Sequence, residues 1–169
     1  NVNGVVKGGT TAGDHGVSIG EVTVTSGGVA GANTKTVSGD PGVFINDNSA
    51  TGVKWDASAD VLGTNGGISI TELGAGPVEV NVSNNALIDG DSDNLGAVGN
   101  GVTISAQAGA ATVTSTAGTV ITGKTGVSAT TTKGTITVDN DGDIGASGDA
   151  VSQDGVAAYI TNADGAGKI

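Results

Sequence analysis

The stretch Gly67-Ile68-Ser69-Ile70 contains the pattern that decides the fold: a glycine followed by apolar residues at every second position. Related tetrapeptides follow five other glycines. The six glycines are Gly16, Gly42, Gly67, Gly101, Gly126 and Gly155. Successive members are 26, 25, 34, 25 and 29 residues apart. A period of roughly 20 to 50 residues is typical of proteins built from stacked repeats.

Two further strands are predicted in many of the repeats: an alternating strand after each glycine strand, and a short strand that ends in glycine. The alternating strands are Val22–Thr25, Val78–Val82, Ala111–Thr114 and Thr135–Val138. The short strands are Val5–Gly8, Val61–Gly63, Ala86–Gly90 and Thr119–Gly123. Period-2 alternation places Val, Ile and Ala on one face of each strand, and coiling turns that face inward. The sequence therefore predicts an all-β protein, a right-handed parallel β-helix (a three-sided β-solenoid) of about six to seven coils.

The coil hypothesis makes a specific statement about one column of side chains. The residues after the six glycines should stack inward, one coil above the next, about 4.8 Å apart. They are Val17, Val43, Ile68, Val102, Val127 and Val156. A β-sandwich also has regularly spaced short strands, but it does not require the same three-strand unit to recur. Residues 1–169 are expected to form a single β-solenoid segment of a longer repeat array, because neither end carries a recognisable cap.

Composition and charge exclude several classes of protein. Glycine contributes 32 residues, and aromatic residues are only 2% of the chain. The apolar residues nevertheless make up 36% and lie largely in alternating runs, which is too high a fraction for a disordered linker. Six basic residues against 17 acidic ones give a net charge of −11. This balance disfavours nucleic acids and anionic membranes as partners. Cysteine is absent, so disulfide scaffolds and thiolate metal sites are excluded. No apolar run is long enough to span a membrane.

The style of the repeats resembles a known family. The segments Val82–Gly90, Thr135–Ile144 and Gly155–Asn162 are similar to the β-helical passenger regions of bacterial autotransporters and related haemagglutinin-like adhesins. The resemblance covers nearly the whole chain but has no fixed motif. It implies a β-helix, export and an extracellular or bacterial cell-surface location, and it implies no ligand.

A second, local resemblance concerns the only histidine. The string from Asp14 to Gly20 is similar to the histidine strand of polygalacturonase-type glycosidases, which are also β-helices. Such enzymes gather carboxylates on neighbouring coils. Here no acid precedes Asp14, and the chain has no arginine with which to hold a uronate. We therefore predict that the chain is not an enzyme, that His15 is a corner residue, and that His15→Ala leaves folding nearly unchanged.

Two runs of alternating aspartates are the metal candidates. They are Asp89, Asp91 and Asp93 in the first run, and Asp139, Asp141 and Asp143 in the second. Carboxylates two residues apart occur in calcium loops, but neither run has the glycine at position six or the glutamate at position twelve of an EF-hand. The runs also lie at different offsets from the following glycine strand and should not stack. We expect acidic turns with at most weak calcium binding, and no other cofactor.

Threonines on alternating strands suggest an ice-binding face as a further alternative. The pairs are Thr23 and Thr25, Thr112 and Thr114, and Thr135 and Thr137. Glu79 and Asn81 occupy the equivalent outward positions between them, which favours an ordinary solvated face. The aromatic residues Phe44, Trp55 and Tyr159 are far apart in sequence and are predicted to be packing or edge residues.

The sequence as a whole predicts a structural or adhesive β-solenoid without catalytic activity. Contacts with protein or glycan surfaces are expected on loops, namely the turn from Asn46 to Ala50 and the excursion from Asp91 to Asn100. That excursion accounts for the 34-residue interval. The alternative is a self-assembling extracellular filament or surface-layer subunit, in which solenoid ends associate end to end. Both functions require the same coils, so the sequence does not separate them.

Overall fold

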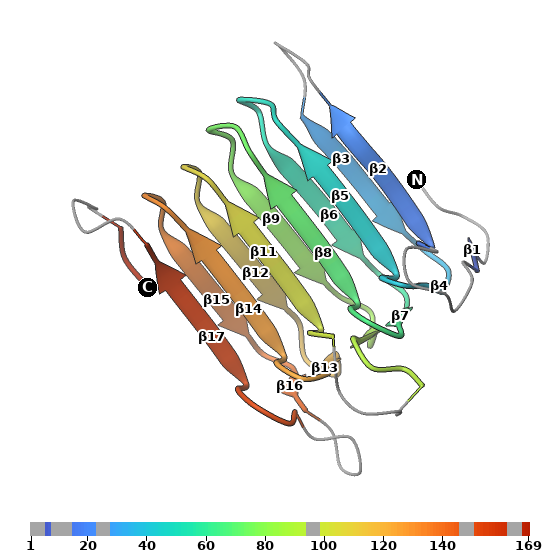
Figure 1. Ribbon diagram of the computed structural model, residues 1–169. Coiled ribbons are helices and arrows are strands. Elements are labelled where there is room, and N and C mark those ends of the chain that lie inside the picture. The colour runs from blue at the N-terminus through green and yellow to red at the C-terminus, as the bar shows by residue number, and fades with distance from the viewer. Residues whose placement is uncertain (1–5, 8–14, 23–27, 94–98, 146–150, 162–166) are drawn as a thin grey trace.

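In the computed structural model, the strands of successive coils stack on one another. The structure describes residues 6–7, 15–22, 28–93, 99–145, 151–161 and 167–169. These residues form strands and no helix, and every strand pair is parallel. Three sheets result, and the fold is a three-sided parallel β-solenoid of about five turns (Figure 1). The predicted fold class is confirmed.

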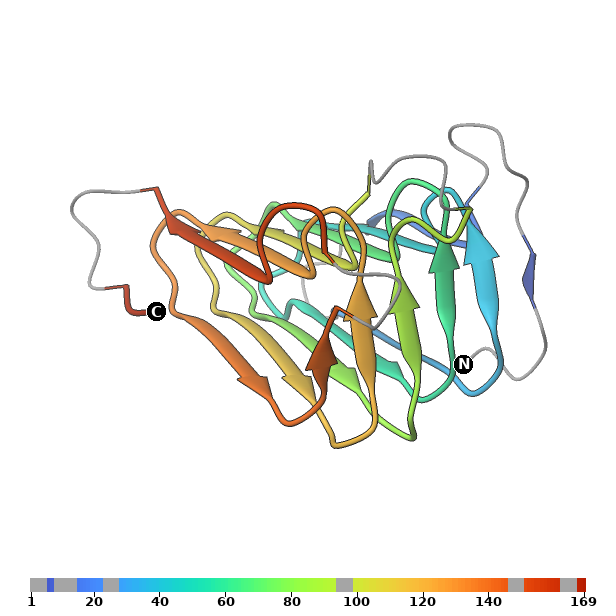
Figure 2. The same cartoon turned by 90° about the horizontal axis from the view of Figure 1, so that it is seen from below.

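The three sheets collect equivalent strands from successive turns. Sheet 1 contains β2 (Val17–Val22), β5 (Val43–Asp47), β8 (Ile68–Glu72), β11 (Val102–Ala106), β14 (Val127–Thr131) and β17 (Val156–Ile160). Sheet 2 contains β3 (Val29–Asn33), β6 (Val53–Ala57), β9 (Val78–Val82), β12 (Ala111–Ser115) and β15 (Ile136–Asn140). Sheet 3 contains β1 (Val6–Lys7), β4 (Val37–Gly39), β7 (Val61–Gly63), β10 (Leu87–Asp89), β13 (Val120–Thr122) and β16 (Asp143–Ile144). In Figure 2 the short strands of sheet 3 form a row of arrows.

The predicted inward column is present in sheet 1. Backbone register pairs Val17 with Val43, and continues through Ile68, Val102 and Val127 to Val156. The four members in β5, β8, β11 and β14 are completely buried. Sheets 2 and 3 add further valines and isoleucines, and together they form one aliphatic core along the axis.

The number of turns was overestimated. Six glycine strands are present, but a glycine strand is only one side of a turn, and β17 is followed by no sheet 2 strand among the described residues. About five turns therefore replace the predicted six to seven.

One predicted strand also lies elsewhere. Val22 ends the sheet 1 strand β2, and residues 23–25 are outside the described residues. The first strand of sheet 2 is instead β3, whose sequence Val-Ala-Gly-Ala-Asn has too few large apolar residues to be recognised.

A tryptophan explains why β3 is so poor in large side chains. Trp55 points inward from β6 and is 1% exposed. It lies beside its register partner Gly31 of β3, where a Cβ atom would overlap the indole ring. The indole Nε1 donates a hydrogen bond to Asn33 Oδ1 at 3.2 Å. Glycine in one coil thus makes room for tryptophan in the next, and Trp55 is a packing residue as predicted.

Candidate functional site

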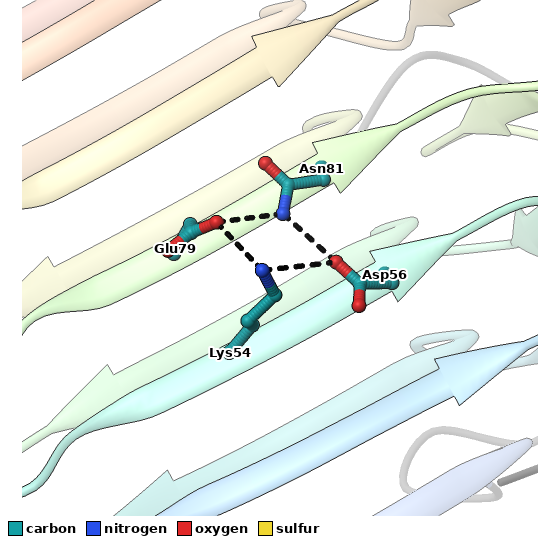
Figure 3. A network of polar contacts seen from close by, with 4 residues as sticks. All are labelled: Lys54, Asp56, Glu79 and Asn81. Carbon is teal, nitrogen blue, oxygen red and sulfur yellow. Dashed lines mark hydrogen bonds and ion pairs between the residues drawn. The ribbon is translucent and has the colours of Figure 1, made fainter.

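The outward face of sheet 2 carries a polar cluster of four residues from two neighbouring strands. Lys54 and Asp56 belong to β6, and Glu79 and Asn81 to β9 (Figure 3). The Lys54 ammonium lies 3.0 Å from Glu79 Oε1 and 3.8 Å from Asp56 Oδ1. The Asn81 amide donates to Asp56 Oδ1 and to Glu79 Oε1, both at 2.8 Å.

Hydrogen bonds within the cluster favour the charged forms of Lys54 and Glu79. The bond to Glu79 and the charge of Asp56 raise the pKa of Lys54, and the bonds from Asn81 and Lys54 lower the pKa of Glu79. All four side chains find partners within the cluster. Exposed ion pairs contribute little to stability, so we interpret the cluster as a contact that fixes the register of β6 against β9.

Sheet 1 has a different outward face. Two columns of side chains point away from the core, one running from β2 to β17 and the other from β5 to β17. Among the side chains that the structure describes in these columns, none is charged. The first column is Ser18, Phe44, Ser69, Thr103, Ser128 and Ala157. The second is Asn46, Thr71, Ser105, Thr130 and Tyr159. We call these two columns the hydroxyl face, because β8, β11 and β14 contribute only serine and threonine to it.

Aromatic side chains lie toward both ends of the hydroxyl face. Near its first strand, the ring of His15 stacks on Phe44 with centroids 4.8 Å apart and planes 10° from parallel. His15 Nδ1 also lies 2.9 Å from the carbonyl oxygen of Asp40. On the last strand Tyr159 is 57% exposed. His15 is thus a corner residue before β2, as predicted, and it has packing contacts that the sequence did not indicate.

Two acids occupy inward positions at the end of sheet 1 strands. Asp47 of β5 and Glu72 of β8 are register partners, and both are completely buried. Asp47 Oδ2 accepts a hydrogen bond from Ser49 Oγ at 2.7 Å, and Glu72 Oε1 accepts one from the Gly74 amide at 2.6 Å. Their other oxygens, Asp47 Oδ1 and Glu72 Oε2, are buried without a hydrogen-bond partner. We call Asp47 and Glu72 the acid pair.

The acid pair corrects the prediction for the turn from Asn46 to Ala50. Asn46 and Asp47 belong to β5, and Ser49 is buried as well as Asp47. Alternation continues two residues beyond Ile45, which turns Asp47 inward. Two residues of the predicted turn therefore belong to the coil, while Asn48 and Ala50 remain exposed outside the strand, where a partner contact stays a prediction. In the second predicted loop, residues 94–98 lie outside the described residues.

The six predicted metal residues lie at two separate corners. Asp89 ends β10 and is buried with Asp91, whose amide donates to Asp89 Oδ1 at 2.8 Å, while Asp93 is exposed. In the second run Asp139 lies in sheet 2 and Asp143 in sheet 3, and Asp139, Asp141 and Asp143 are all exposed. Register places Asp143 beside Val120 and not beside an acid of the first run. Within the described ranges no three acidic or histidine residues gather as a metal site requires.

Calcium is expected to raise the melting temperature only slightly at millimolar concentration. The two runs are apart, and calcium prefers six to eight oxygen ligands. A thermal melt with calcium, with magnesium as the control, measures the effect. A large shift at micromolar calcium would contradict this prediction, because it requires tight binding to the folded state.

The structure describes only some of the threonines on which the ice-binding alternative depends. Thr112 and Thr114 lie on the outward face of β12, and Thr137 stacks on Thr112. Thr135 precedes β15, and Thr23 and Thr25 are outside the described residues. The same columns contain the charged cluster of β6 and β9. The hydroxyl-rich surface of the solenoid is thus on sheet 1 and not on sheet 2, which carries Thr112, Thr114 and Thr137.

Comparison with known proteins gives no relative. No family model matches the chain, and neither a curated protein nor a solved structure is significantly similar to it. No helix among the described residues is long and apolar enough to cross a membrane.

Proposed function

We propose that this chain is a structural and adhesive β-solenoid, secreted or displayed on a bacterial cell surface, and that it has no catalytic role. The hydroxyl face is the observation that carries the proposal. On a chain of net charge −11, this face presents two uncharged columns dominated by serine and threonine, whereas the face of sheet 2 contains Lys54, Asp56, Glu79 and Asp139. Location rests on the resemblance of the repeats to exported β-helices.

A neutral glycan is the partner that fits this face best. Hydroxyl groups both donate and accept hydrogen bonds, as the hydroxyls of a sugar do. An uncharged face attracts no ionic partner, and the acidic remainder of the chain repels anionic ones. Exposed Tyr159 adds an apolar ring with a polar tip, a combination that suits a partly wet contact. Because the coils hold the columns in register, the face is already ordered before it binds.

Binding to immobilised neutral polysaccharides tests the proposal. Thr103→Glu places a charge in the middle of the hydroxyl face, and it is expected to weaken binding at least tenfold because the carboxylate must be desolvated against a neutral partner. Thr112→Glu is the matched control, since Thr112 points outward from the neighbouring sheet of the same turn. Equal binding by both variants, or binding only to protein or anionic surfaces, would contradict a glycan site on sheet 1.

The edge strand β17 favours a second function, assembly into filaments or surface layers. Within β17, the outward-facing side chain of Tyr159 is 57% exposed and the inward-facing side chain of Val156 is 44% exposed. A parallel edge strand offers free backbone groups either to a further coil of the same chain or to a second copy. Electron microscopy and sedimentation over a range of concentrations distinguish these functions, because only end-to-end assembly produces long fibres.

A further inference from the structure

The acid pair of Asp47 and Glu72 places two carboxylates in a core that is otherwise mainly apolar. Apart from these two residues, the column contains Ala106 and Thr131 in the next two coils. Both acids are completely buried, so their charges are removed from water. A buried carboxylate needs a cation or hydrogen-bond donors to compensate for lost hydration.

The surroundings supply only part of that compensation. Ser49 donates to Asp47, and Gly74 donates to Glu72. Val22 and Ala106, the register neighbours of the pair on either side, are uncharged residues. Lys54 and Glu79 lie on the outward face of sheet 2, and no ion pair with Asp47 or Glu72 occurs in the part of the chain that the structure describes. The oxygens Asp47 Oδ1 and Glu72 Oε2 therefore have no donor while both acids are ionised.

We propose that Asp47 and Glu72 share one proton in the folded protein, and that this proton makes the stability of the solenoid sensitive to pH near neutrality. A protonated Glu72 becomes a donor to Asp47, so one hydrogen bond satisfies both buried oxygens and removes one of two adjacent charges. Burial raises the pKa of Glu72 from 4.5 to about 7, and the Gly74 amide opposes this shift while the hydrogen bond and charge of Asp47 add to it.

The direction of the pH effect follows from the raised pKa. Between pH 4.5 and about 7 the folded state keeps a proton that the unfolded state has lost. Stability from the pair is therefore fully present below pH 4.5 and is lost as the pH rises to about 7. From pH 5 to pH 8 the unfolding equilibrium constant should increase on the order of 100-fold through this pair.

Two measurements on the full chain test the shared proton. Carboxyl ¹³C NMR of the wild-type protein should show Glu72 titrating near pH 7, well above the ordinary glutamate pKa of 4.5. Urea unfolding at pH 5 and pH 8 should show the 100-fold change in wild type and a much smaller one in Glu72→Gln, because the amide donates to Asp47 at every pH. Glu79→Gln, which removes an exposed glutamate from the next strand of the same turn, should keep the wild-type dependence.

Three results would overturn the proposal. One is titration of Glu72 near its ordinary value, which the NMR experiment detects even where a variant does not fold. Another is the same pH dependence in wild type and Glu72→Gln. The third is a calcium-dependent recovery of stability at pH 8 in wild type but not in Glu72→Gln, since the pair would then be a metal site and not a proton site.

Discussion

Replacing Trp55 with alanine is expected to lower the free energy of unfolding by about 3–5 kcal/mol, which is the usual loss for a large aromatic side chain in a core. Trp55 is the largest of the fully buried side chains, and its indole also donates to Asn33. The preceding coil cannot fill the space, because the facing residue in β3 is Gly31. Chemical denaturation measures the loss. Phe44→Ala, at an outward position of β5, is the control and should have a clearly smaller effect.

The same contact predicts a coupling between two coils. Gly31→Ala introduces a Cβ atom that would overlap the indole, and overpacking of this kind destabilises by about 1–3 kcal/mol. In a Trp55→Ala background that overlap is absent, so Gly31→Ala should then be nearly neutral. A double-mutant cycle isolates this interaction energy. Purely additive effects would show that the two residues do not share one space.

Trp55 also shows what the sequence could predict and what it could not. Alternation after Gly42, Gly67 and Gly101 is a local pattern, and it gave the inward column of sheet 1 correctly. The glycine that accommodates Trp55 lies in the preceding coil, and its role depends on register between strands 24 residues apart. A compensation between coils has no local signature, and for this reason β3 was not recognised.

The acid pair was overlooked for a different reason. Asp47 is the fifth residue after Gly42, and Glu72 is the fifth after Gly67, so the period-2 rule places both inward. The composition of residues 46–49, Asn-Asp-Asn-Ser, is typical of a turn, and this signal ended the predicted strand at Ile45. The fifth position is acidic in the first three repeats, at Glu21, Asp47 and Glu72. A register shift in β2 pairs Val22 and not Glu21 with Asp47, and this shift has no signature in the local sequence.

The hydroxyl face illustrates a third limit. Its residues follow from the glycine-strand pattern, because outward positions alternate with the inward valines and isoleucines. The sequence alone does not show that the outward faces of sheets 1 and 2 differ in charge. The charged residues of β6 and β9 gather on sheet 2 only when all coils are in register, and the uncharged face is recognised by that comparison.

The largest effect is expected for a charge placed in the inward column. Val102→Asp puts a carboxylate at a completely buried position with only Ile68 and Val127 beside it in register. An unpaired buried charge costs several kcal/mol, which is comparable to the total stability of about 5–15 kcal/mol of a typical domain. The variant should therefore lose cooperative unfolding or fail to fold. Circular dichroism during a denaturant titration measures this.

Two matched variants separate the effect of pointing the new carboxylate into the core from the other effects of introducing an aspartate. Thr103→Asp alters the next residue of the same strand, which points outward, so its loss should be about 1 kcal/mol or less. Val156→Asp alters the same column in β17, where the side chain is 44% exposed, and its loss should lie between the other two. Because each coil of a solenoid contacts only its neighbours, a defect in β11 interrupts the stack in the middle, whereas one in β17 affects a single interface. Equal losses at Val102 and Thr103 would contradict the alternation on which the fold depends.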